Sequence, residues 1–255
     1  MRLCTIILIN SFFFMIADAG EPPIRQRIEN SVKTALKSFD SNKPVEIYLA
    51  TRATPTPDTF KWDTKPSQFF IGADLADHPN LLEFTTHCAA AHLVNNSYTK
   101  NRVASLVTFF APTILLGTAT VATFGETTTG ALAGCVAISW LICSKLGLHQ
   151  KIQDHFYKQA YQAACKKLID QNNMKPIASY TAYSLLIKHG PLTQETRNKI
   201  IKQALESKGY ILEAEYKKDP ETCKVTIKNE KTNALMGEST IELTSAGLGS
   251  FKFNQ

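Results

Sequence analysis

The stretch Phe84–Asn96, FTTHCAAAHLVNN, closes a run that begins at Phe69 and reads FFIGADLADHPNLLEFTTHCAAAHLVNN. This run predicts a strand, a loop and then a helix that carries His87, Cys88 and His92. Residues four apart lie one turn apart on the same helix face, so Cys88 and His92 form a pair that could grip one Zn²⁺. His87 lies about 100° around the helix from Cys88 and is less well placed.

The residue after Cys88 decides whether such a site could hydrolyse a peptide. In the motif H-E-x-x-H, a glutamate follows the first metal ligand and activates water. Here that position holds Ala89, which cannot accept a proton. The alternative interpretation is that His87, Cys88 and His92 are ordinary packing residues, as lone histidines and cysteines on apolar helices commonly are.

The run resembles the zinc metallopeptidases of the HtpX and CAAX prenyl endopeptidase type, a gluzincin group. In that family a similar segment leads into a helix of the form F-x-x-x-H-E-x-x-H-x-x-N. Aligning Phe84 and His92 with its first Phe and last His places Cys88 at the first ligand and Ala89 at the general base. The resemblance covers about Pro44–Gln203, and it implies a degenerate member that has lost the general base.

The resemblance also implies a partner helix with the pattern E-x-x-A-D-x-x-A, whose Glu would bind zinc. The helix expected at Leu148–Gln171 matches best with Gln153 at the Glu position, and a neutral amide is a weaker ligand than a carboxylate. Asp154 and His155 could replace it only if the helix were rotated. The alternative is a simple packing stripe formed by Ile152, Phe156, Ala160, Ala163 and Ala164.

A third match lies further along the chain. The residues His189-Gly190-Pro191, followed by Arg197, resemble the family's T-H-P-x-x-x-x-R element, which closes over the cleft. The resemblance thus makes His189 and Arg197 candidate site residues. Thr193 is expected to cap a helix that runs to about Ser207.

The segment 103–148 has the most unusual composition of the chain. Val103–Phe124 carries no formal charge, GETTTG predicts a turn, and Ala131–Leu148 is apolar apart from Lys145. Each half approaches the roughly 20 residues that a helix needs to span a bilayer, so the segment predicts a transmembrane hairpin. The alternative is a hairpin buried in a soluble core. In the resembled family an apolar hairpin commonly lies between the two zinc-binding helices.

The first 19 residues predict a secretory signal peptide. Arg2 precedes an apolar core at Leu3–Ile16, and Ala17-Asp18-Ala19 forms a small-x-small cleavage site. An uncleaved membrane anchor is the alternative. We therefore expect an exported or membrane-associated protein of the periplasm, cell envelope or secretory pathway. The basic residues that flank the hairpin would instead leave both of its ends in the cytoplasm, so the topology stays open.

The remaining patterns predict an α+β fold that is mainly α. A helix is expected at Ile24–Phe39, short strands at Val45–Thr51 and Gln68–Gly72, and a loop at 53–65. The alternating residues after Tyr210 predict a small sheet or meander. The expected organisation is a signal peptide at 1–19, a metallopeptidase-like helical domain with the hairpin at 20–209, and a small β region at 210–255.

Composition narrows the functional classes. The chain has 255 residues, 44% hydrophobic and 20% charged, with a formal net charge of +6, which is typical of a folded protein. The positive residues are scattered and form no basic run interleaved with aromatic residues, so we expect no nucleic-acid partner. Five cysteines remain after the signal peptide, and an odd number argues against a complete disulfide framework.

Three functions remain open from the sequence. The first is a catalytically inactive peptidase-like protein, exported and membrane-associated, that binds a peptide or protein partner. The second is an active zinc endopeptidase that uses Cys88 or His87 with His92 and a carboxylate such as Asp154. The third is a membrane-inserting hairpin protein unrelated to peptidases. Zn²⁺ is the one cofactor that these patterns suggest.

Overall fold

The computed structural model describes residues 22–50, 68–124, 129–186, 192–218, 221–243 and 251–254. Several predicted features lie outside these residues. They are the signal peptide, the loop at 53–65, most of the hairpin turn and His189.

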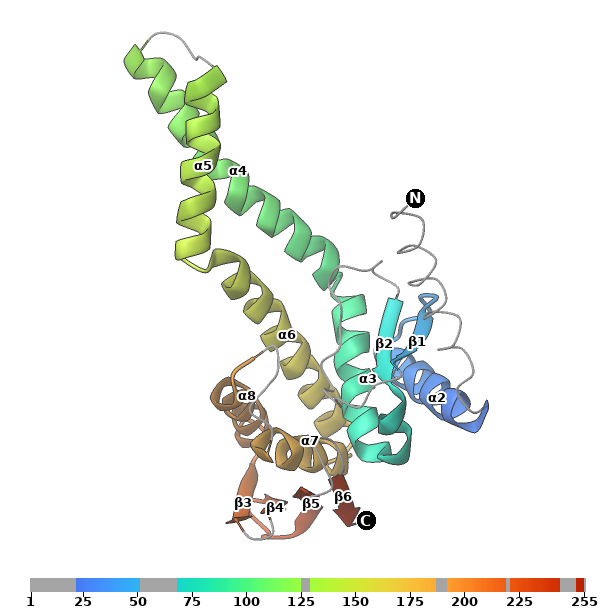
Figure 1. Ribbon diagram of the computed structural model, residues 1–255. Coiled ribbons are helices and arrows are strands. Elements are labelled where there is room, and N and C mark those ends of the chain that lie inside the picture. Colours follow the sequence, from blue (N-terminus) through green and yellow to red (C-terminus); the bar gives the residue numbers. More distant parts are fainter. Residues whose placement is uncertain are drawn as a thin grey trace.

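The chain forms helices in its first four fifths and strands mainly at its end (Figure 1). The elements in chain order are α2 (Pro22–Ser38), β1 (Glu46–Ala50), β2 (Gln68–Gly72), the 3-10 helix η1 (Ala73–Asp77), α3 (Pro79–Val94), α4 (Ser97–Phe124), α5 (Thr129–Lys145), α6 (Leu148–Asp170), α7 (Lys175–Leu186), α8 (Gln194–Glu206), β3 (Tyr210–Lys218), β4 (Glu221–Asn229), β5 (Leu235–Leu243) and β6 (Phe251–Asn254).

The predicted class, α+β and mainly α, is confirmed. In the described residues, β1 and β2 form a two-stranded parallel sheet, and the other four strands form an antiparallel sheet in the order β3-β4-β5-β6. The alternation predicted strands at Tyr210–Tyr216, Lys224–Lys228 and Ser239–Leu243, and β3, β4 and β5 extend further than these bounds; β6 was not predicted. Helix α4 also begins at Ser97, six residues before the apolar run that starts at Val103, because the polar residues that precede Val103 are helical as well.

Helix α3 lies at the centre of the fold. Pro79 begins it at a position where a missing backbone N–H costs nothing. Nearly every residue from Leu81 to Leu93 is buried, because α2, α6 and α7 pack around it. At its end Asn96 turns the chain with a φ of 49°, and the Lys43 ammonium donates to the Leu93 carbonyl at 3.2 Å and to the Asn96 amide oxygen at 2.9 Å. The chain can therefore change direction there and enter α4.

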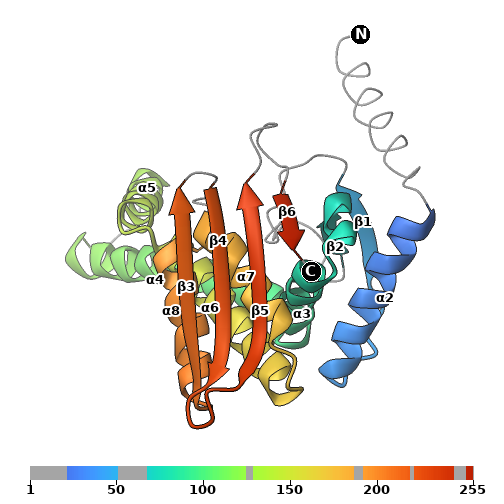
Figure 2. The ribbon, with the colours of Figure 1, turned by 90° about the horizontal axis from the view of Figure 1, so that it is seen from below.

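The C-terminal sheet completes the same core. Figure 2 shows the sheet lying across α6, α7 and α8. The inward side chains of Cys223, Val225, Ile227 and Ile241 are fully buried and belong to the cluster that α3, α6 and α7 form. The outward face is charged and holds the pairs Lys224–Glu238 and Lys228–Glu213. The β region is thus packed against the helices as part of one core.

Helices α4 and α5 form the predicted hairpin, which extends away from the body (Figure 1). Inside it the Thr120 hydroxyl lies 3.7 Å from the Cys135 sulfur, and the Cys143 thiol donates to the Thr108 carbonyl at 3.4 Å. Its large apolar side chains point outward: Val103, Leu106, Val107, Phe110, Ile114, Leu115, Val121, Val136, Ile138, Trp140, Leu141, Ile142 and Leu146 are all exposed. Within this chain the hairpin is therefore not buried in the core, contrary to the alternative expected from the sequence.

Among the described residues, one helix is long and apolar enough to cross a membrane. The segment Arg102–Thr123 of α4 passes this test, and none of its most apolar window is buried. A second candidate is α5 joined to α6, which meet at a bend of 47°. Helix α5 alone has 17 residues, which is just short of a comfortable span.

Candidate functional site

The site that the sequence predicted lies where α3 faces α6. The Phe84 and Tyr161 rings lie 6.0 Å apart, and about two turns further along α3 the His92 ring meets the Tyr157 ring edge-on at 5.2 Å. Phe84, early in α3, contacts Tyr161, whereas His92, later in α3, contacts Tyr157, which comes earlier in α6. The two helices therefore run antiparallel, with aromatic rings between them.

His87 points toward the other side of α3. Its Nδ1 atom lies 2.8 Å from the Glu83 carbonyl oxygen, and its ring centroid is 6.1 Å from that of Phe39, just after α2. Burial lowers the pKa of His87 below its ordinary value. Its Nε2 atom has no hydrogen-bond partner among the described residues. His87 therefore faces α2 and not the α3–α6 face.

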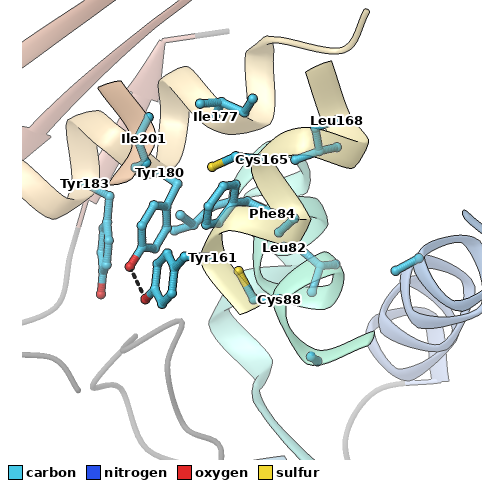
Figure 3. Packing of buried hydrophobic residues seen from close by; sticks show 14 of the residues in the cluster. Leu82, Phe84, Cys88, Tyr161, Cys165, Leu168, Ile177, Tyr180, Tyr183 and Ile201 are labelled. Atoms are coloured by element: carbon cyan, nitrogen blue, oxygen red, sulfur yellow. Dashed lines mark hydrogen bonds between the residues drawn. The ribbon is translucent and has the colours of Figure 1, made fainter. Parts of the chain in front are cut away.

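Cys88 is buried in the main hydrophobic cluster. In the view of Figure 3 its sulfur lies between Tyr161 and Leu82. Above it Phe84 stacks on Tyr180 with ring centroids 4.2 Å apart, and the Tyr180 and Tyr161 hydroxyls share a hydrogen bond. Apolar and aromatic groups thus occupy the space around this thiol.

His92 is buried on the same side of α3, one turn beyond Cys88. Burial lowers the pKa of His92 to about 3, so its imidazole is neutral at physiological pH. A neutral imidazole is the form that binds metals. Its aromatic neighbour, however, is the Tyr157 ring. An edge-on contact of this kind stabilises the imidazole of His92 as a packed aromatic group.

The candidate residues of α6 lie on different sides of that helix. Gln153 is half-buried and lies one turn before Tyr157, on the side of α6 that faces α3. Asp154 accepts a hydrogen bond from Gln150 at 2.8 Å, and His155 is exposed and lies 2.9 Å from the Gln159 amide. Helix α6 is therefore not rotated in the way that would bring Asp154 or His155 to α3.

Arg197 is buried at the junction of α7 and α8. Its guanidinium donates to the Leu192 carbonyl at 2.9 Å and to the Ser184 carbonyl at 3.5 Å. These bonds join the end of α7 to the start of α8, so Arg197 stabilises the connection between these helices. His189, in that connection, lies outside the described residues.

These residues do not fit a zinc ion. Among the described residues, no three His, Cys, Asp or Glu side chains are placed to hold a metal together. The α3–α6 face offers Cys88 and His92, but the third position is the neutral Gln153, and Tyr157 packs on His92. Ala89, at the position of the general base, is buried and inert. This face therefore lacks both a third charged ligand and a general base.

The sequence did not reveal the tyrosines that occupy this face. Tyr157 and Tyr161 are four residues apart on α6, and that spacing could have predicted an aromatic stripe. Tyr180 comes from α7 and meets them only through tertiary packing.

Comparisons with protein-family models, with curated proteins and with solved structures give no match.

Proposed function

We propose that this protein is a membrane-anchored binding protein with a metallopeptidase-like arrangement of helices and no peptidase activity. The α4–α5 hairpin enters the bilayer, and the body beside it binds a peptide or protein. The observation that carries the proposal is the exposure of the hairpin's large apolar side chains, such as Ile114 at 62% and Leu115 at 69%.

The dimensions of the hairpin support insertion. At about 1.5 Å per residue, the 28 residues of α4 measure about 42 Å. This length exceeds the roughly 30 Å of a bilayer's hydrocarbon core. In water, an apolar surface over two helices would favour aggregation, whereas lipid chains cover it at no such cost.

The loss of catalytic groups supports a binding function. The general-base position holds Ala89, the third-ligand position holds the neutral Gln153, and the Tyr157 ring packs on His92. Without a general base a hydrolytic rate falls by roughly 10²–10⁴. The resemblance to metallopeptidases implies that a peptide would lie near these helices.

The two-stranded sheet offers a place for that peptide. In the part of the chain that the structure describes, β1 and β2 pair with each other alone, in parallel register from Glu46–Gln68 to Ala50–Gly72. Sheets of two strands are marginal, and an extended peptide can add a strand to an open edge. This edge is where we expect a peptide partner to bind.

Flotation with lipid vesicles tests the membrane anchor. The full chain should float with vesicles and resist alkaline extraction. Replacing Ile114→Arg and Leu115→Arg puts two charges at mid-span, each costing about 2.5–3.5 kcal/mol, and should release the protein. The matched control adds the same charges at exposed body positions, Gln162→Arg and Gln203→Arg, and should still float. If the hairpin variant stays in the membrane, another segment is the anchor and the proposal is wrong.

Elemental analysis and a peptide-cleavage assay test the absence of enzymatic activity. We expect the purified protein to hold no stoichiometric zinc and to leave unfolded casein intact, as should the His92→Ala variant. About one zinc per chain, lost in His92→Ala together with cleavage, would contradict this and favour an active endopeptidase.

A further inference from the structure

A hollow lies at the foot of the hairpin, where α4, α5 and α6 meet. Its volume is about 280 Å³ and it is partly open to the surroundings. Helix α4 contributes to its lining near the body, α5 near its last turn and α6 near its first turn. The lining includes Ser105, Thr108, Trp140, Cys143, Leu148 and Ile152.

The lining is suited to a hydrocarbon chain. It combines one indole and two aliphatic side chains with small hydroxyl and thiol groups, and none of the described lining residues carries a formal charge. The Cys143 thiol already bonds the Thr108 carbonyl across the helices. This uncharged lining offers no ion pair to a charged ligand, whereas a run of methylene groups gives up no hydrogen bonds on entry.

Basic residues lie close in sequence to the lining residues. Arg102 comes three residues before Ser105 on α4, Lys145 comes two residues after Cys143 on α5, and Lys151 precedes Ile152 on α6, and all three are exposed. The acidic residue of this part of α6, Asp154, accepts a hydrogen bond from Gln150. Three exposed cations in the helix turns that line the hollow match a molecule with an anionic head and an apolar tail.

The hollow also lies at the depth where such a molecule would be found. Trp140 is 62% exposed, and tryptophans of membrane proteins concentrate at the boundary between headgroups and chains. If α4 spans the bilayer from Arg102, then Ser105 and Thr108 lie one to two turns inside that boundary. The hollow therefore opens where headgroups meet chains.

We propose that this hollow holds one acyl chain of an anionic phospholipid, with the headgroup phosphate against Arg102, Lys145 and Lys151. The inference rests on the proposed insertion of the hairpin, because insertion brings the hollow among lipids. A volume of 280 Å³ lies just below the range of typical small-molecule pockets, about 300–1,000 Å³, and is too small for a helix of another protein.

Lipid retention by the detergent-purified full chain tests the site. Native mass spectrometry should find one dioleoyl phosphatidylglycerol per chain, held at least tenfold more tightly than dioleoyl phosphatidylcholine. Ser105→Phe fills the hollow and should reduce retention at least tenfold. The matched control Val107→Phe lies on an exposed position of the same helix and should retain the lipid. Replacing Arg102→Gln and Lys145→Gln should remove the preference for phosphatidylglycerol.

A second measurement needs no substitution. Cys143 lines the hollow, so phosphatidylglycerol should slow its alkylation by N-ethylmaleimide several-fold more than phosphatidylcholine does, as read by peptide mapping. Equal retention by Ser105→Phe and Val107→Phe, or equal alkylation rates in the two lipids, would overturn the site. A wild-type chain that floats with vesicles but retains no lipid overturns the lipid site alone, whereas a chain that does not float overturns the membrane anchor as well.

Discussion

His92 shows how burial decides what a single residue can do. The spacing of Cys88 and His92 predicted a metal-binding pair, and the structure puts both residues on the α3–α6 side of one helix. The spacing could not predict what the opposite helix presents. There the chain has Tyr157 and Gln153, so the histidine packs against a ring and stays neutral.

That burial makes the stability of the protein depend on pH. The pKa of His92 is lowered from 6.5 to about 3 in the folded chain. Below pH 6.5 the unfolded chain therefore binds a proton that the folded chain does not bind. The free energy of unfolding should fall as the pH drops from 6.5 toward 3, by about 1.4 kcal/mol per pH unit from this residue. Burial of His87 acts in the same direction.

Replacing His92→Leu should remove this contribution. Denaturant titrations in detergent at pH 7, 6 and 5 should give a curve of unfolding free energy against pH that is flatter than that of the wild type. Leu93→Ala, at the next buried position, is the control and should lower stability equally at each pH. Parallel curves for the wild type and His92→Leu would contradict a neutral, buried imidazole.

At the scale of elements, composition predicted the hairpin well and its packing poorly. The uncharged run after Val103 and the turn at GETTTG gave two antiparallel helices, which the structure contains. The exposed outer faces could not be read from hydrophobicity, because an apolar helix suits a protein core and a bilayer equally. The register of α4 against α5 depends on small groups such as Thr120 and Cys135, which carry little periodic signal.

Cross-linking tests that register. The Thr120 hydroxyl lies 3.7 Å from the Cys135 sulfur, so a cysteine at 120 should form a disulfide with Cys135 under mild oxidation. After oxidation and denaturation, the Thr120→Cys variant should then have two fewer thiols that react with maleimide than it has before oxidation. Thr118→Cys lies on an exposed position of the same helix and should keep its thiol. Equal thiol loss in both variants, or none in either, would show a different pairing of the helices.

For the whole molecule, local pattern predicted the elements and missed how they combine. Most of the helices and strands followed from local sequence patterns, and β2 was predicted at its observed bounds, whereas β6 was not predicted. The sequence suggested a separate β region after Tyr210. Its alternating residues predicted strands, yet only tertiary packing reveals that the inward side chains share a core with α3, α6 and α7. The same applies to the aromatic face, which needs Tyr180 from a third helix.

Gly237 gives the most direct test that sheet and helices form one unit. A Cβ atom at this position in β5 would lie 2.8 Å from the Met174 Cβ and 2.9 Å from the Met174 carbonyl carbon, just before α7. Backbone cannot move aside as a flexible side chain can, so Gly237→Ala should lower the free energy of unfolding by about 1–3 kcal/mol. Gly134→Ala is the matched control, because a Cβ atom there meets nothing within 4 Å, and it should not lower stability. Denaturant titration in detergent, monitored by the signals of both helix and sheet, should show Gly237→Ala shifting one common transition. A variant as stable as the wild type, or one whose sheet unfolds before the helices, would mean that the sheet is not docked on α7 as described.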